Sequence, residues 1–230
     1  MTITFAHRGA RLEAPENTVE AFRIGLELGA RGLETDAHLS ADGEVVLVHD
    51  ATIRTGIRRV KVAETPAPDL ALHGVPRLAE LYETLGTDFE LSIDLKAPAV
   101  GVAILEVARR AEAAERLWLC APDLDTLRDL GATGDAPPRL VHSTPRRRIS
   151  GPLERHAAEL ADAGIAAMNF HYTEWSPGLV ALFQRFGLLA FAWDVQEERH
   201  LRAMLAAGLD AVYSDRVQRM VAVAGAFDSP

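Results

Sequence analysis

Residues 32–50, which read GLETDAHLSADGEVVLVHD, contain the one strand that departs from a regular alternation of strands and helices. Two apolar strand candidates, 32–38 and 45–49, are joined by Ser40-Ala41-Asp42-Gly43. Asp-Gly is a strong hairpin-turn signal, and a loop this short leaves no room for a helical crossover. The second strand should therefore run antiparallel to the first. This hairpin would place His49 roughly opposite Glu34.

Outside this hairpin, short β-type runs alternate with helical patterns along nearly the whole chain. The strand candidates are 3–7, 32–38, 89–95, 116–120, 139–142, 165–170, 188–195 and 211–214, and the helix candidates are 18–28, 78–85, 99–113, 124–130, 151–163, 178–186, 197–207 and 216–225. Such alternation predicts a parallel sheet with crossover helices, and eight βα units are the number that closes a (β/α)8 TIM barrel. We therefore expect a single domain over residues 1–230, with an extra antiparallel hairpin strand.

Residues 50–76 interrupt the βα alternation after the hairpin. They show no convincing core element and carry Arg54, Arg58, Arg59 and Lys61, followed by two prolines. We interpret the segment as a small insertion after strand 2, or a lid over the mouth of the barrel. Elsewhere, Asn17 followed by Glu20 resembles a capping box that would begin the first helix.

Composition narrows the classes of function. The chain has 230 residues, of which 48% are hydrophobic and 25% charged, and its formal net charge is −9. An acidic surface repels nucleic-acid backbones, so a bound phosphate would need a local positive site. Cys120 is the single cysteine, so an intramolecular disulfide is excluded. We see neither a signal-peptide pattern nor an apolar run long enough to insert stably in a bilayer, and we expect a cytoplasmic protein with a small-molecule substrate. The oligomeric state stays open.

Carboxylates lie near the ends of two predicted strands. Glu34 and Asp36 are two residues apart, so their side chains share one face, and Asp94 and Lys96 repeat that spacing. Carboxylate oxygens without thiolates favour a hard divalent cation, Mg²⁺ or Ca²⁺. The alternative is that these are solvated charges at the rim of the barrel, which is less convincing for two pairs than for one.

Further polar residues at strand ends complete a possible reaction site. His7 and His49 each follow an apolar run, and histidine can act as acid or base near neutral pH. Arg8 and Lys96 are the candidate phosphate contacts. Trp193 serves either core packing or the lining of a substrate pocket. Other polar residues near strand ends are weaker candidates, and other histidines are expected at the surface. The weaker candidates are His142, Asn169, His171 and Tyr172, and the expected surface histidines are His38, His73, His156 and His200.

Taken together, these residues resemble the glycerophosphodiester phosphodiesterase family of the phospholipase C-like phosphodiesterase superfamily. The resemblance rests on His7-Arg8-Gly9, Pro15-Glu16-Asn17-Thr18, Glu34-Thr35-Asp36, His49-Asp50, Asp94-Leu95-Lys96, Ala192-Trp193-Asp194 and Ser214-Asp215. It implies a TIM-barrel hydrolase that releases glycerol 3-phosphate and an alcohol. It also implies metal ligation by Glu34, Asp36 and Asp94, acid/base catalysis by His7 and His49, and phosphate contacts from Arg8 and Lys96.

The chain also departs from the family pattern. Asp94 stands where the family usually has Glu, and an aspartate there resembles the sphingomyelinase D branch, so a lysophospholipase D-like activity on lysophospholipids is an alternative. Asp194 and Gln196 replace the usual Thr and Asn beside Trp193. A phosphodiester-binding protein without turnover is a second alternative, against which the complete set of polar residues argues. A nuclease is a third, and the net charge disfavours it.

Overall fold

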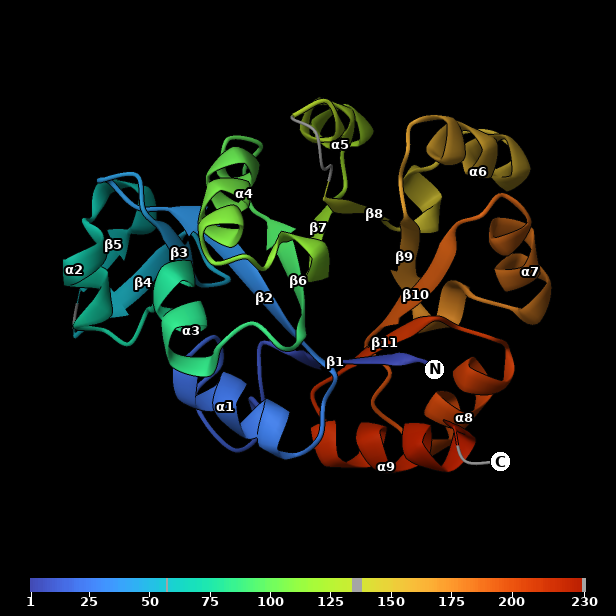
Figure 1. Ribbon diagram of the computed structural model, residues 1–230, viewed down its shortest axis with the longest axis horizontal. Helices are drawn as coiled ribbons and strands as arrows, with labels where there is room; N and C mark the ends of the chain where they lie inside the picture. Colours follow the sequence, from blue (N-terminus) through green and yellow to red (C-terminus); the bar gives the residue numbers. More distant parts are fainter. Residues whose placement is uncertain (57, 134–137, 229–230) are drawn as a thin grey trace.

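A closed parallel barrel forms the centre of the molecule in the computed structural model, which describes residues 1–56, 58–133 and 138–228 (Figure 1). Its strands are β1 (Ile3–His7), β2 (Gly32–Leu39), β6 (Glu90–Leu95), β7 (Leu117–Ala121), β8 (Arg139–Ser143), β9 (Ala167–His171), β10 (Leu189–Trp193) and β11 (Ala211–Ser214). They pair in parallel in the order β1-β11-β10-β9-β8-β7-β6-β2, and β1 also pairs with β2, which closes the barrel. The predicted TIM barrel is confirmed.

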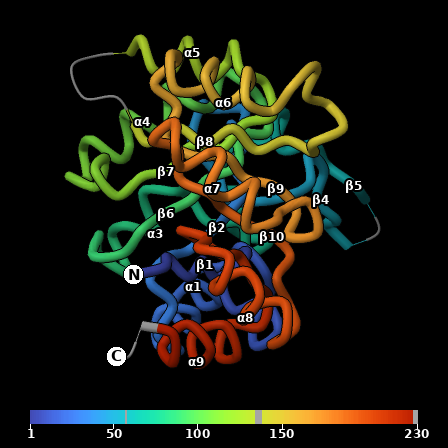
Figure 2. Tube along the Cα trace, turned by 90° about the vertical axis from the view of Figure 1, so that its right-hand side faces the viewer, coloured from blue at the N-terminus to red at the C-terminus, as the bar shows by residue number. Residues whose placement is uncertain are grey.

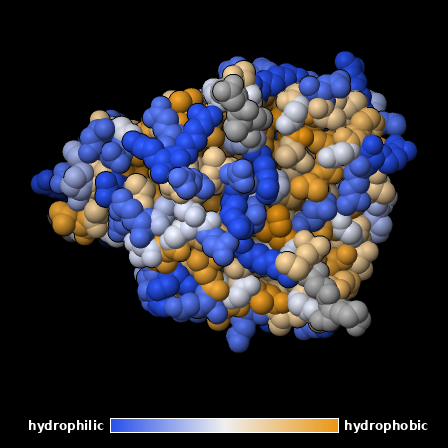
Figure 3. Space-filling model, in the orientation of Figure 1, coloured by the Kyte–Doolittle hydropathy of each residue, from blue (hydrophilic) through white to orange (hydrophobic). Residues whose placement is uncertain are grey.

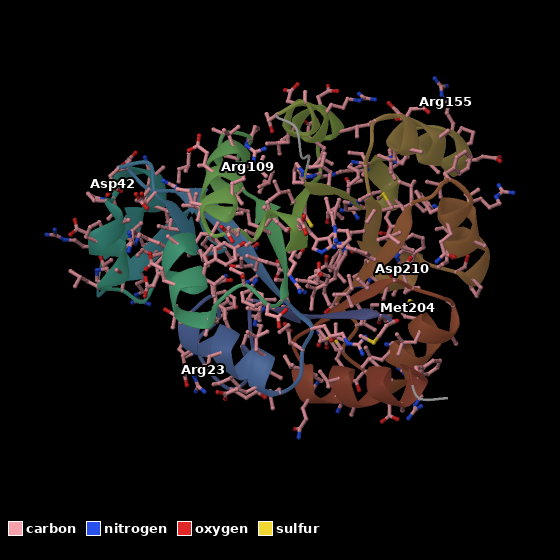
Figure 4. All side chains as sticks on the ribbon, in the orientation of Figure 1. Arg23, Asp42, Arg109, Arg155, Met204 and Asp210 are labelled. Atoms are coloured by element: carbon pink, nitrogen blue, oxygen red, sulfur yellow. The ribbon has the colours of Figure 1, made fainter. Side chains whose placement is uncertain are left out.

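Helices follow the strands and surround the barrel (Figure 1). They are α1 (Val19–Glu27), α3 (Leu78–Leu85), α4 (Val100–Arg110), α5 (Leu124–Gly131), α6 (Leu153–Asp162), α7 (Pro177–Arg185), α8 (Glu198–Ala206) and α9 (Val217–Asp228). Within the described residues, 3₁₀ turns also occur between them: η1 (Val62–Glu64), η2 (Ala114–Arg116), η3 (Arg146–Arg148) and η4 (Tyr172–Glu174). Each helix turns apolar residues toward the sheet, while Arg23 on α1 and Arg155 on α6 extend away from it (Figure 4). No helix of the described residues is long and apolar enough to cross a bilayer.

The predicted hairpin is present. β3 (Val45–Leu47) runs antiparallel to β2, with Ala37 opposite Leu47 and Leu39 opposite Val45. The turn places Gly43 at a φ of +81°, a left-handed conformation that glycine adopts without the steric penalty that a side chain would bring. β3 ends two residues earlier than expected, but the Val48 amide still donates to the Asp36 carbonyl oxygen at 2.9 Å. The returning chain therefore brings His49 back along β2.

Residues 50–76 contain more structure than the sequence suggested. They form a two-stranded antiparallel sheet, β4 (Thr52–Thr55) and β5 (Arg58–Lys61), followed by η1 and α2 (Ala67–Ala71). Beneath them lies a small apolar cluster made of Val46, Val62, Ala67, Leu70 and Val75. The expectation of no core element was wrong, because widely spaced apolar residues gather around Val46 on the outer side of β3.

The β4–β5 sheet and α2 project from the body of the barrel (Figure 1). The projection carries a mainly hydrophilic surface on the face that Figure 3 shows. Figure 2 places both chain termini on one side of the molecule and the tip of β4–β5 on the opposite side. The insertion therefore lies far from the termini, and its assignment as a lid stays a prediction.

Alternate residues of each barrel strand point inward, and their character changes along the barrel. The lower interior is filled by aromatic rings: Phe5 stacks on Tyr213 at 4.7 Å between centroids, and Trp118 meets Phe191 edge-on at 5.1 Å. Gly32 makes room for this floor, because a Cβ there would lie 2.6 Å from the Phe5 ring. Above the floor, the inward positions are polar, and there the cavity opens.

Candidate active site

A cavity of about 330 Å³ lies at the carboxyl ends of the barrel strands. All eight predicted site residues line it, together with six others. The predicted residues are His7, Arg8, Glu34, Asp36, His49, Asp94, Lys96 and Trp193, and the others are Ser143, Thr144, Pro145, Asn169, Asp194 and Tyr213. The structure thus brings the predicted set together, although the role of each residue stays a prediction.

Three carboxylates converge on one side of the cavity. Glu34 and Asp36 come from β2, and Asp94 lies beside Asp36 on the neighbouring strand β6. Each offers an oxygen, and these oxygens lie within 4.8 Å of one another. Burial, followed by the nearby charges of Asp36 and Asp94, raises the pKa of Glu34 to about 8, and burial raises that of Asp94. Burial therefore favours the neutral form of both Glu34 and Asp94.

Two cations accompany these carboxylates. Lys96 Nζ lies 2.6 Å from Asp36 Oδ1 and 3.9 Å from Asp94 Oδ2, while Arg8 Nε lies 3.3 Å from Asp36 Oδ2 without hydrogen-bond alignment. Burial opposes ionisation of Asp36, but Lys96 and Arg8 outweigh it and lower the pKa of that carboxyl. The Arg8 backbone has a φ of +56°, and its amide donates to Glu34 Oε2 at 3.0 Å. Asp36 is thus ionised, and it holds both cations at the cavity.

The two predicted acid/base histidines share one arrangement. His7 Nδ1 lies 2.6 Å from Asp215 Oδ1, and His49 Nδ1 lies 2.8 Å from Asp50 Oδ1. In both rings Nε2 is the nitrogen left for chemistry, and His7 Nε2 is 3.8 Å from Glu34 Oε2. Burial lowers the pKa of His7, but the carboxylates of Glu34 and Asp215 outweigh burial and raise it overall. A carboxylate behind each imidazole fixes its orientation and tautomer.

Residues 16–18 have roles that differ from the expected helix cap. Thr18 is the N-cap of α1, because its Oγ1 accepts from the Ala21 amide at 3.2 Å. Asn17, with a φ of +57°, instead turns inward: its Nδ2 donates to Asp36 Oδ2 at 3.4 Å, and its Oδ1 accepts from Thr35 Oγ1 at 2.8 Å. Glu16 Oε1 accepts from Arg8 at 2.9 Å. The loop therefore supports the ionic cluster as well as the helix.

The opposite side of the cavity is built by β8, β9 and β10 and is mostly uncharged. Asn169 Nδ2 donates to Ser143 Oγ at 3.1 Å. Trp193 is 39% exposed, so it lines the cavity rather than the core, and its ring meets His171 edge-on at 4.5 Å. Asp194 follows with a φ of +64°, and its Oδ2 accepts a hydrogen bond from His171 Nε2 at 3.1 Å.

His142 and His156 lie outside the cavity. They form a buried pair, His142 Nδ1 to His156 Nε2 at 3.1 Å, so the surface position predicted for His156 was wrong. The sequence did not assign Asp215 a role in the site. Its position directly after the strand that ends at Ser214 was the only signal that could have found it.

The assembled groups can support attack on a phosphodiester. Oxygen ligands suit a hard divalent cation, two histidines can transfer protons, and Arg8 and Lys96 supply positive charge for a phosphate. The fit to a cation is also consistent in charge: when all three carboxylates are ionised, they sum with Arg8 and Lys96 to −1, so a divalent ion would bring the site to +1 and match one phosphodiester anion.

Comparisons with known proteins agree with this geometry. Residues 7–219 match the model of the glycerophosphoryl diester phosphodiesterase family. A glycerophosphodiester phosphodiesterase of Caldanaerobacter subterraneus subsp. tengcongensis is 26% identical over 96% of each chain. Among solved structures, a glycerophosphodiester phosphodiesterase of Thermotoga maritima has a TM-score of 0.85 at 24% identity, covering 97% of this chain and 98% of its own. An Oleispira antarctica phosphodiesterase in complex with the product sn-glycerol-3-phosphate has a TM-score of 0.79 at 22% identity, covering 96% of each chain.

Proposed function

Because the chain belongs to the glycerophosphoryl diester phosphodiesterase family, we propose that it hydrolyses glycerophosphodiesters to glycerol 3-phosphate and an alcohol. The observation that carries the proposal is the convergence of three carboxylates, two histidines and two cations in one cavity at the barrel mouth. TIM-barrel enzymes place their chemistry at this end of the barrel.

We assign Glu34, Asp36 and Asp94 as the residues that hold a divalent cation, Mg²⁺ or Ca²⁺. The support is the chemistry of the donor set, three carboxylates whose oxygens lie within 4.8 Å of one another. When bound, the cation would act as a Lewis acid on the phosphoryl oxygens. Asp94 offers a shorter arm than glutamate, so it should set the preferred ion size.

The remaining roles belong to side chains of the cavity wall. One of His7 and His49 removes the proton from the attacking hydroxyl or water, and the other returns a proton to the leaving alkoxide through its Nε2. Asp215 and Asp50 hold the two rings by their Nδ1 atoms. Arg8 and Lys96 orient the phosphate and offset its charge, and Trp193 lines the path of the alcohol.

The experiment measures release of glycerol 3-phosphate from glycerophosphocholine by chelator-stripped protein, with Mg²⁺, Ca²⁺ or no metal added back. We expect release only with an added ion, and none from a Glu34→Gln, Asp36→Asn double variant. Release at the full rate without metal would refute the cation assignment. No release under any condition would refute the proposed reaction.

A parallel reaction with lysophosphatidylcholine separates the lysophospholipase D alternative. Preferred turnover of the lysolipid would replace glycerophosphodiesters as the substrate class.

We expect the protein to act in the cytoplasm on small phosphodiesters rather than nucleic acids, since its net charge of −9 disfavours polyanions. We also propose that residues 50–76 act as a lid within a single domain, which faster tryptic cleavage after Arg58 or Arg59 without ligand than with it would support.

A further inference from the structure

On the uncharged side of the cavity, Asn169 carries a buried polar atom without a hydrogen-bond partner among the described residues. Asn169 is 5% exposed, its Nδ2 donates to Ser143 Oγ at 3.1 Å, and its Oδ1 is buried without a hydrogen bond to any described residue. Buried polar atoms are nearly always paired in native proteins, so an unpaired one in a binding cavity indicates a ligand group. Turning the amide over would leave its nitrogen unpaired in the same place.

The fold fixes this side chain in place. Asn169 is the central residue of β9, with Met168 and Phe170 packed outward among the helices and Asn169 facing inward. It lies directly beside Ser143 in the β8–β9 register, and its hydrogen bond to Ser143 holds the amide. The unpaired atom is therefore a fixed feature of the cavity wall.

The position of Asn169 relative to the ionic cluster indicates which end of a bound substrate it meets. The carboxylates come from β2 and β6, whereas β9 is separated from β6 by β7 and β8 and from β2 by β10, β11 and β1. Asn169 therefore faces the phosphate-binding side across the cavity. A substrate whose phosphate contacts Arg8 and Lys96 presents its far end to this wall.

We propose that Asn169 is a specificity-determining residue that binds the terminal hydroxyl of the glycerol moiety, the one farther from the phosphorus. The inference rests on the proposed function and deepens it. A hydroxyl both donates and accepts, so it pairs with the amide in either orientation. A quaternary ammonium has no N–H and leaves Oδ1 unpaired, so the choline end of glycerophosphocholine does not fit here. The glycerol end, and not the leaving alcohol, lies against β8 and β9.

The test compares glycerophosphocholine with 2-hydroxypropyl phosphocholine, which lacks only the terminal hydroxyl. The wild-type protein should prefer the complete substrate by about tenfold or more in kcat/KM, because a site built around a hydroxyl discriminates against its absence. Asn169→Leu, of similar size but without polar atoms, should bring the ratio close to one. Met168→Leu, an outward-facing change on the same strand, should leave the ratio as in the wild type.

The outcomes separate the two proposals. Absence of wild-type turnover with both substrates refutes the proposed function. Wild-type turnover with an unchanged preference in Asn169→Leu overturns the role of Asn169, and equal loss of both substrates shows a merely structural role. Calorimetric binding of glycerol 3-phosphate against inorganic phosphate gives a readout without turnover. Asn169→Leu, or Asn169→Ala if the leucine variant does not fold, should lower that affinity ratio about tenfold, and an unchanged ratio overturns the inference.

Discussion

Protonation of the buried His142–His156 pair should limit the stability of the protein in mild acid. His142 Nε2 lies 3.2 Å from the carbonyl oxygen of Pro122, so it must donate, and Nδ1 is then the acceptor for His156 Nε2–H at 3.1 Å. Both hydrogen bonds of His142 are satisfied only when its ring is neutral. A second proton on His142 would point at the donor of His156, which breaks that hydrogen bond and buries a positive charge.

The size of the effect follows from the pKa of His142. Burial, followed by the neighbouring His156, lowers this pKa from 6.5 to about 4, while Asp123 and Glu159 oppose the shift. The unfolded chain therefore takes up the proton first as pH falls, and the folded state loses relative stability between pH 6.5 and pH 4. A difference of about 2.5 pH units corresponds to roughly 3 kcal/mol in the free energy of unfolding.

The assay is urea denaturation of the wild type and His142→Gln at several pH values between 7.5 and 4. Glutamine keeps a donor for Pro122 and does not titrate, so the variant should lose about 3 kcal/mol less than the wild type over this range. His73→Gln, at an exposed position just after α2, is the matched control and should follow the wild type. Parallel loss of stability in the wild type and His142→Gln would refute this account of the pair.

Four further changes test the site and its frame. Asp36→Asn removes the carboxylate that holds both cations and should abolish tight Mg²⁺ or Ca²⁺ binding in a calorimetric titration; an unchanged isotherm would show that the cation site is elsewhere. His49→Ala should lower kcat by roughly 10²–10⁴-fold with an unchanged thermal midpoint, as for removal of a general acid or base, and near-normal turnover would exclude that role. Asp215→Asn should lower kcat by roughly 10²–10⁴-fold, because the His7 ring loses the carboxylate that fixes its tautomer; an unchanged rate would show that His7 does not need this partner. Gly9→Ala should destabilise the fold by more than about 1 kcal/mol in urea melts, because φ is +76° and the new Cβ would lie 2.6 Å from the Ala21 carbonyl carbon; an unaltered midpoint would show that the loop relaxes.

The sequence predicted those parts of the fold that local patterns encode. Asp42-Gly43 specified the antiparallel hairpin, and the period-two spacing of Glu34 and Asp36 placed both carboxylates on the inner face of one strand. Positions on the parallel strands brought seven of the eight predicted residues to one cavity, because parallel strands end at the same rim, and the antiparallel hairpin brought His49 there.

Features that depend on partners distant in the sequence were not predictable in this way. The partner of His7 is Asp215, 208 residues away, and the barrel closure that joins them has no local signature. Asn17 satisfied the local pattern of a helix cap, yet its left-handed backbone lets Thr18 take that role and turns its amide to Asp36. His156 lies on a helix with many polar residues, and its pairing with His142 of β8 accompanies its burial.

The aromatic floor closes the cavity at its lower end, so the cavity opens only at the barrel mouth. Aromatic rings fill the barrel below the site, so substrate and product must both pass through the mouth at the carboxyl ends of the strands. These rings belong to Phe5, Trp118, Phe191 and Tyr213. Substrate entry and product exit therefore compete for the same opening. Under the proposed function, a product phosphate held by Arg8 and Lys96 would occupy the place of the incoming diester, and turnover would then depend on the rate at which glycerol 3-phosphate leaves.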